Sequence, residues 1–201
     1  MPRTAEQNQE IKDKRRAKIV AAAIRVFASN EYDSVAIDDI VEIVGCSHGL
    51  FYHYFDTKED VYRAIIEEIA IPNQTVPPVK QAREKGGFEG LKILANYMAS
   101  VVASGTKLYN IAMVWLRMVN ATKLDKKMAE VAKAHDLRLV IRDLVREGQV
   151  DGVVISGDVE EIADIIYGIF EKQMLKRKQE GKMKRYFTSD VLCAMLLKKP
   201  L

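Results

Sequence analysis

Apolar residues recur along most of the chain at the spacing of helices, and no segment shows the convincing alternation of a strand. Between residues 19 and 27 they follow the i, i+3, i+4, i+7, i+8 stripe of an amphipathic helix, at Ile19, Ala22, Ala23, Val26 and Phe27. Two short apolar segments, 37–44 and 47–55, follow on either side of Gly45. The pattern therefore predicts an all-α protein.

The next predicted helix has clear start and stop signals. Thr57 and Asp60 have the spacing of a capping box, with Asp in the role that Glu usually takes. Three of the five prolines follow within seven residues, at Pro72, Pro77 and Pro78. Because proline lacks the amide hydrogen and clashes with the preceding turn, we expect the helix to end at these prolines.

The prolines mark the clearest boundary in the chain, so we predict an N-terminal domain over residues 1–70 and a larger C-terminal domain over residues 71–201. Beyond this boundary the apolar spacing predicts five more helices, at 88–104, 108–120, about 122–147, about 158–178 and about 189–198. Thr122 and Asp158 each have an acidic residue three positions on, as at helix starts. With the four helices before the boundary, the chain is expected to have about nine.

Composition narrows the class of protein. The 201 residues are 48% hydrophobic and 29% charged, which is typical of globular chains. No apolar run approaches the ~18 residues of a membrane span, and the charged N-terminus is not followed by the apolar stretch of a secretory signal. The two cysteines, Cys46 and Cys193, have no partner at metal-binding spacing. We therefore expect a soluble cytoplasmic protein with no metal and no cofactor.

Charge is informative through its distribution. The net charge of +3 is too small to indicate nucleic-acid binding by itself. Residues 12–25 contain six basic side chains and one acid, and residues 172–185 contain seven basic side chains and one acid. We interpret the second cluster as a solvated helix face, whereas the first gains interest from the motif that follows it.

Residues 37–55, IDDIVEIVGCSHGLFYHYF, have the organisation of a helix-turn-helix. The inner face of the first helix would be Ile37, Ile40, Val41 and Val44. Gly45 tolerates the positive φ of a tight turn, and Ser47 is a natural N-cap for the second helix. The inward residues of that helix would be Leu50, Phe51 and Tyr54 or Phe55. In such motifs the second helix enters the major groove of DNA.

The polar residues of this segment suit contacts with DNA. Histidine can hydrogen-bond to base edges or phosphates, tyrosine hydroxyls and lysine suit phosphate oxygens, and a glycine lets a helix approach the bases closely. The candidate DNA-binding residues are Ser47, His48, Gly49, Tyr52, His53, Tyr54 and Lys58. The two histidines are five positions apart, which is a poor spacing for a shared metal site.

From Arg16 to about Ile66 the chain resembles the N-terminal domain of TetR/AcrR-family transcriptional regulators. The matching pieces are RRAKIVAAAIRVFASNEY and DDIVEIVGCSHGLFYHYFDTKEDVYRAII, and the glycine turn and the candidate DNA-binding residues fall at the family's spacing. The motif covers about a quarter of the chain. The remainder is similar only in length and helical pattern.

This resemblance implies a function and its partners. The family implies a homodimer joined through the last two helices, about 158–178 and 189–198, that reads a palindromic operator in double-stranded DNA. The middle helices would enclose a pocket for a small effector whose binding releases the DNA. The implied protein is a ligand-responsive repressor without enzymatic activity and without a membrane segment.

The motif departs from the family at several positions. Val35 and Ala36 stand where Thr and Ser usually cap the first helix, so Ser34 is expected to cap it instead. Asp38 stands where a basic residue is frequent. Residues 1–63 carry 9 basic and 11 acidic side chains, a net charge of −2. These changes leave room for a modest DNA affinity.

Candidates for effector binding are apolar or aromatic residues of the predicted middle helices and of the helix from about 158. They are Tyr97, Met98, Val101, Tyr109, Met113, Trp115, Met118 and Tyr167. Core packing is the more common role for any one of them. Their methionine and aromatic content favours an apolar ligand.

Two other classes of function compete with this interpretation. A TetR-like scaffold could act through protein–protein interaction, which the weakly basic motif favours slightly. An enzyme would need a nucleophile–base pair, a glycine-rich phosphate loop or a metal-ligand set, and the sequence shows none of these.

Overall fold

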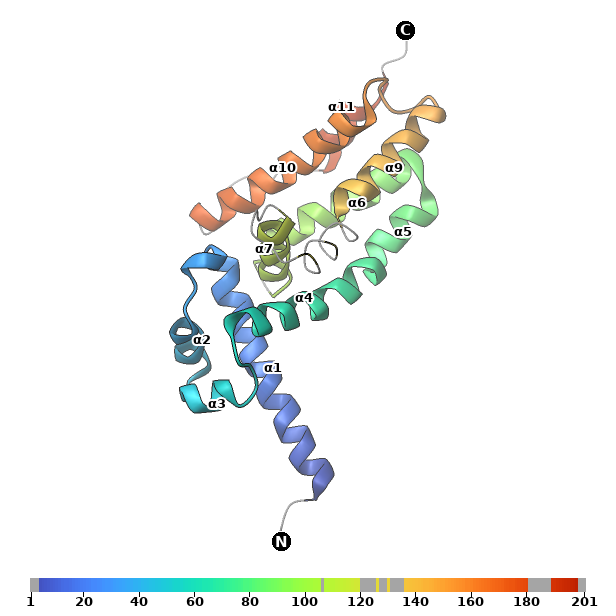
Figure 1. The fold of residues 1–201 in the computed structure, drawn as a ribbon. Helices are drawn as coiled ribbons and strands as arrows, with labels where there is room; N and C mark the ends of the chain where they lie inside the picture. The colour runs from blue at the N-terminus through green and yellow to red at the C-terminus, as the bar shows by residue number, and fades with distance from the viewer. Residues whose placement is uncertain are drawn as a thin grey trace. The chain divides into compact units, whose positions relative to one another are not determined.

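The computed structural model describes residues 4–105, 107–119, 126, 130, 136–180 and 189–198. Helices are the only regular elements longer than one residue among these residues, and one isolated β-bridge joins Val154 to Leu197 (Figure 1). The predicted all-α fold is confirmed. The chain divides into two compact units, Met1–Ile69 and Ala70–Leu201. No helix among the described residues is long and apolar enough to cross a membrane.

The first unit contains the predicted helix-turn-helix. Its elements are α1 (Ala5–Ser29), the 3₁₀ helix η1 (Tyr32–Ser34), α2 (Ile37–Val44), α3 (His48–Tyr52) and the start of α4 (Lys58–Thr75). The predicted apolar stripe of α1 is buried, with Phe27 only 1% exposed. Residues 5–18 of the same helix are exposed except for the half-buried Ile11. The unit is therefore packed around the second half of α1.

A left-handed glycine sets the turn between α2 and α3. Gly45 has φ 68°, and its amide donates to the carbonyl of Val41 at 2.9 Å. Ser47 then caps α3 as expected, because its Oγ accepts the amide hydrogen of Leu50 at 3.2 Å. Helix, turn and helix thus follow from two local signals.

The start of α4 is the predicted capping box. The Thr57 amide donates to the carboxylate of Asp60 at 3.1 Å, and the Asp60 amide donates to Thr57 Oγ1 at 3.1 Å. The predicted end of the helix is wrong for Pro72, since α4 continues to Thr75. It stops at Thr75, two residues before Pro77, because the residue before a proline is disfavoured in the helical conformation.

The other two prolines start a helix that was not predicted. Pro77 and Pro78 occupy the first positions of α5 (Pro77–Lys85), where a missing amide hydrogen costs nothing. With this element the described residues form ten α-helices, against about nine expected.

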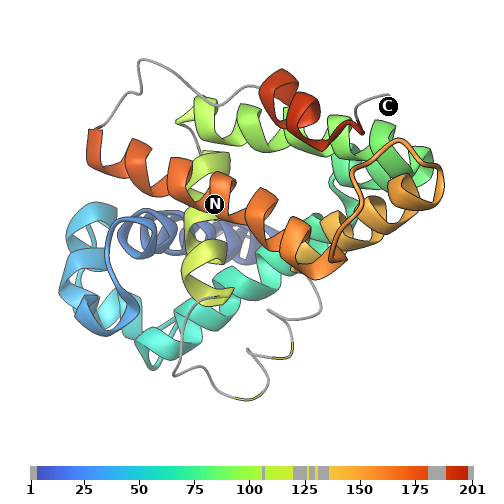
Figure 2. The same cartoon turned by 90° about the horizontal axis from the view of Figure 1, so that it is seen from above.

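The second unit is a bundle around α6. Its further helices are α6 (Gly87–Ser104), α7 (Lys107–Val119), α9 (Leu137–Val150), α10 (Val159–Glu180) and α11 (Ser189–Leu196). Figure 2 shows α10 beside α6 and α9, and these helices contact one another. The buried residues include Leu94, Met113, Ile141, Leu144, Ile166 and Met174.

The predicted helix over 122–147 is interrupted. Thr122 and Asp125, its expected capping box, lie outside the described residues. Asp136 has an extended backbone, with ψ 120°, and its carboxylate accepts the amide hydrogen of Arg138 at 3.0 Å. This aspartate caps a new helix, α9, so the prediction of one uninterrupted helix is wrong.

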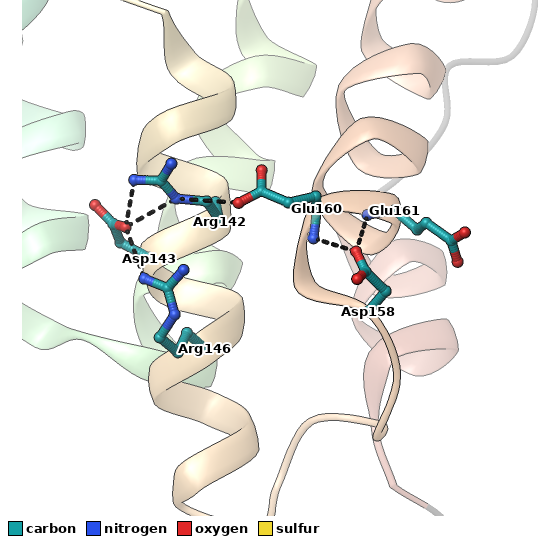
Figure 3. Close-up of polar contacts among 6 residues, drawn as sticks. All are labelled: Arg142, Asp143, Arg146, Asp158, Glu160 and Glu161. Atoms are coloured by element: carbon teal, nitrogen blue, oxygen red, sulfur yellow. Dashed lines mark hydrogen bonds and ion pairs between the residues drawn. The ribbon is translucent and has the colours of Figure 1, made fainter.

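Charged side chains join the start of α10 to α9 (Figure 3). Asp158 Oδ1 accepts the amide hydrogens of Glu160 and Glu161, each at 2.9 Å, which confirms the expected cap at Asp158. Glu160 in turn lies 3.7 Å from Arg142 Nε of α9. Arg142 and Arg146 both contact Asp143, at 3.1 and 3.4 Å, so both cations of the cluster have a carboxylate partner.

Arg177 of α10 binds the end of α6. Its side chain is only 9% exposed, and its guanidinium donates to the carbonyls of Val102 and Ala103. It also lies 5.1 Å over the ring of Tyr109, whose hydroxyl donates to the carbonyl of Met174 at 2.8 Å. A cation here compensates the negative end of the α6 dipole. The interpretation of residues 172–185 as a wholly solvated face is therefore wrong at Arg177.

The glycine turn predicts a measurable difference between two glycines. Gly45→Ala should reduce the free energy of unfolding by about 1–2 kcal/mol, because an L-residue is strained at positive φ. Gly49→Ala should leave it unchanged or raise it by up to about 1 kcal/mol, since Gly49 is helical and a Cβ there meets only Ser47 Oγ at 4.0 Å. Urea denaturation of both variants measures this, and equal stabilities would contradict the assigned turn.

Candidate DNA-binding motif and effector pocket

The residues around α3 separate into a buried set and an exposed set. Phe51 and Phe55 are 0% and 5% exposed, whereas Tyr52 between them is 50% exposed. The other exposed candidates are Ser47, His48, Gly49 and His53. Tyr54 and Lys58 are half-buried. The start of α3 therefore presents polar side chains to solvent while its aromatic face holds the helix in place.

His48 is held by an acid from the preceding helix. Its Nε2 lies 2.5 Å from Asp38 Oδ1, and both side chains are exposed. Since an ionised carboxylate can only accept, Nε2 is the donor and Nδ1 is left to other partners. The unusual acid at position 38 thus orients a candidate DNA-contacting side chain.

Lys58 has partners within its own unit. Its Nζ donates to the carbonyls of Tyr32 and Val35, at 3.0 and 3.1 Å, and lies 4.7 Å over the Tyr32 ring. An ammonium has three hydrogens, so one is left for a phosphate oxygen. Lys58 therefore fixes the connection before α2 to the start of α4, a role that its place in the sequence did not indicate.

The start of α2 differs from the prediction. Ser34 Oγ donates to the carbonyl of Glu31 at 2.8 Å, so Ser34 does not cap α2. The N-cap is Ala36, whose amide donates to Asp39 Oδ2 at 2.8 Å. Ser34 lies inside η1, and this 3₁₀ turn is what carries its hydroxyl away from the helix end.

An apolar hollow lies in the second unit among α6, α7, α9 and α10. It is lined by Tyr97, Met98, Val101, Leu108, Ile111, Ala112, Trp115, Leu137, Tyr167 and Phe170. Five of the eight predicted effector-binding residues are in this set: Tyr97, Met98, Val101, Trp115 and Tyr167. Tyr109, Met113 and Met118 are buried and do not line it. Burial raises the pKa of the Tyr97 and Tyr167 phenols, which keeps both neutral.

One side of Tyr167 faces charged groups. The guanidinium of Arg138 lies 5.3 Å from the Tyr167 ring and is bound to Asp136, with Nε 2.7 Å from Oδ2. Asp136 is 9% exposed. Among the described residues, no group of His, Cys, Asp and Glu side chains could hold a metal ion. The Arg138–Asp136 pair therefore lies beside the otherwise apolar lining of the hollow.

Residues 19–65 match the family of bacterial regulatory proteins, tetR family. This segment is a domain of the tetR family.

Several transcriptional regulators are similar to this chain in sequence. The Bacillus subtilis fatty acid metabolism regulator protein is 25% identical over 161 residues, which cover 77% of this chain and 79% of that protein. Other curated TetR-like regulators match over 50–60 residues, so the match spans only 26–30% of their length.

Solved structures share the fold. FadR from Bacillus subtilis in complex with stearoyl-CoA has a TM-score of 0.64 at 22% identity, over 90% of this chain and 97% of that one. AibR in complex with isovaleryl coenzyme A and operator DNA has a TM-score of 0.70 at 16% identity, over 90% and 94%. At these identities the likeness concerns the TetR fold alone.

Within the TetR-like segment, Tyr32 is a residue that sequence reasoning missed. Its hydroxyl donates to Glu59 Oε1 at 2.7 Å, and its ring packs 5.8 Å from Phe27 and 4.9 Å from Tyr62. Burial and the Glu59 carboxylate raise the pKa of Tyr32. The hydrogen bond from Tyr32 lowers the pKa of Glu59. The contact joins η1 to α4 across 27 positions in the sequence, so local sequence patterns could not predict it.

Tyr32→Phe tests this contact through its pH dependence. Because the folded pKa of Glu59 is depressed, the contact stabilises the protein above the ordinary carboxyl range and is lost as pH falls through the folded value. We expect the variant to be less stable than the wild type at pH 7, with the difference shrinking towards pH 3. An NMR titration should show the pKa of Glu59 rising in the variant. A pKa unchanged by the substitution would contradict the assignment.

Proposed function

We propose that this chain is a dimeric TetR-family DNA-binding repressor that a small acyl compound releases from its operator. The observation that carries the proposal is the pattern around α3, where buried Phe51 and Phe55 alternate with the exposed Tyr52 and His48. In DNA-binding motifs of this kind, the second helix enters the major groove and the exposed side chains at its start contact the bases. The family assignment of residues 19–65 supports the same reading.

The two units are assigned different roles. Unit 1 would bind operator DNA through Ser47, His48, Gly49, Tyr52, His53, Tyr54 and Lys58. Unit 2 would bind the effector and the second subunit. Helix α4 begins in the first unit and ends in the second, so the two proposed roles are linked by a continuous helix.

Dimerisation would use α10 and α11. Exposed apolar side chains lie on both helices: Ile165 at 59%, Leu175 at 42%, Val191 at 51% and Met195 at 55%. An apolar hollow lined in part by Met98, Ile166, Ile169, Phe170 and Leu192 lies beside them. Exposed apolar groups clustered on neighbouring helices favour burial against a second copy.

The effector class follows from the hollow of unit 2. Its lining of methionine, aromatic and aliphatic side chains is suited to an acyl chain. Fold neighbours bind stearoyl-CoA and isovaleryl coenzyme A, and one relative is a fatty acid metabolism regulator. We therefore extend the acyl-coenzyme A class to this chain.

The mechanism would be a shift of population. The effector would favour a dimer whose two α3 helices no longer match successive major grooves, which lie about 34–36 Å apart. A coupling free energy of about 1–3 kcal/mol would change operator affinity about 5–150-fold.

Selection of DNA fragments on the purified protein tests the proposal. We expect enrichment of a palindrome, because a two-fold symmetric dimer presents two identical reading helices. Tyr52→Phe and His48→Ala should each weaken binding to the enriched duplex by about 10–100-fold, because each variant loses a hydrogen bond to a phosphate or a base. Both side chains are exposed, so thermal stability should not change.

Tyr97→Phe is the matched control, since Tyr97 lies in unit 2 and should not affect DNA binding. Failure to enrich any sequence from effector-free protein would contradict the proposal and favour a protein-interaction role. An enriched asymmetric site would contradict the dimer.

Trp115 gives a direct measurement of the effector. It is the one tryptophan of the chain and lines the hollow, so its emission should change saturably with palmitoyl-CoA and not with coenzyme A. The same concentration of palmitoyl-CoA should lower operator affinity about 5–150-fold. Trp115→Phe should abolish the fluorescence change while release from DNA persists. Unchanged emission and unchanged operator binding would rule out acyl-coenzyme A as the effector.

A further inference from the structure

The helix-turn-helix segment of this protein is acidic. Residues 30–67, from the end of α1 into α4, contain nine Asp or Glu and two Lys or Arg side chains, a net charge of −7. Arg63 lies 3.6 Å from Asp60, and Lys58 gives two of its three ammonium hydrogens to backbone carbonyls, so the segment has one hydrogen of Lys58 left for phosphate. DNA affinity depends on cations that neutralise phosphates. A DNA-binding unit with this segment needs another source of positive charge.

Helix α1 has the opposite charge. Residues 5–29 contain six Lys or Arg side chains and three acids, a net charge of +3. Five of the six cations lie in residues 12–18, in the half of α1 that is exposed. Among the described residues, Lys12, Arg15 and Lys18 have no ion-pair partner, whereas Lys14 binds Glu10 at 2.6 Å. This half of α1 runs past α3 in Figure 1.

Arg16 fixes which face of α1 is turned to the motif. Its guanidinium lies 5.2 Å over the ring of Phe55, directly after α3. At about 100° per residue, Lys12 is on the same face one turn earlier, about 6 Å along the axis, and Arg15 flanks it. Lys14 and Arg25 lie on roughly the opposite face from Arg16 and Lys12, whereas Lys18 lies one turn after Arg15.

We propose that the face of α1 formed by Lys12 and Arg15 binds the phosphate backbone of DNA beside the groove that α3 enters. This rests on the proposed function and adds a second contact surface outside the helix-turn-helix. The surface supplies attraction that does not depend on sequence, while α3 reads the bases. Because the motif itself is acidic, this attraction dominates the affinity of the protein for any duplex.

The test is the salt dependence of binding for a variant with both cations removed. Lys12→Gln with Arg15→Gln keeps good helix formers at exposed positions, so circular dichroism and thermal stability should be unchanged. Binding would be measured between 50 and 200 mM salt, to the duplex enriched by selection and to a random duplex of the same length. Loss of two phosphate contacts should make the negative slope of log K against log salt shallower by about 1.8. Affinity for both duplexes should fall by the same factor.

Lys14→Gln with Arg25→Gln is the matched control, with the same charge change on exposed side chains of the same helix that are turned roughly away from Lys12. Its slope should stay near that of the wild type. A wild-type slope in the Lys12 and Arg15 variant, or an equal fall in both variants, would overturn the proposed surface while leaving DNA binding by α3 intact. Absence of DNA binding by the wild-type protein would overturn the proposed function and this surface together.

Discussion

The left-handed backbone of Gly45 is the constraint on which the candidate DNA-binding surface depends. It reverses the chain after α2, and only then can Ser47 cap a second helix. With α3 started at that point, Phe51 falls into the core and Tyr52 into solvent. A start displaced by one residue would turn the helix by about 100° and exchange these two faces. One φ value thus decides which side chains are available to a partner.

Local signals made the fold largely predictable, whereas contacts distant in sequence did not. The capping residues Ser47, Thr57 and Asp158 act within three positions, and each was predicted and found. The prolines misled because the same residue can end a helix or begin one, and the difference depends on whether the following residues form a new helix. The break at Asp136 was missed because apolar spacing continues across it.

The candidate sites show the same division. Exposure of the polar residues of α3 follows from the period of a short helix, so the residue types and their direction could be predicted. The carbonyl partners of Lys58 lie 23 and 26 positions before it in the sequence, and no local pattern indicates contacts at that separation. In unit 2, aromatic and methionine side chains suit both the core and a ligand. Tyr109 is a candidate of both kinds, and in the structure its hydroxyl donates to the Met174 carbonyl.

The Arg177 contact also restricts how this sequence can change. Gly105 follows α6 with φ 57°, and a Cβ built there would collide with the Arg177 guanidinium. Position 105 directly follows α6 and Arg177 lies in α10, 72 residues later, yet a side chain can be introduced at position 105 only if Arg177 moves or is replaced. In evolutionary terms they are a coupled pair, and we expect homologues that lack the glycine to lack the arginine as well.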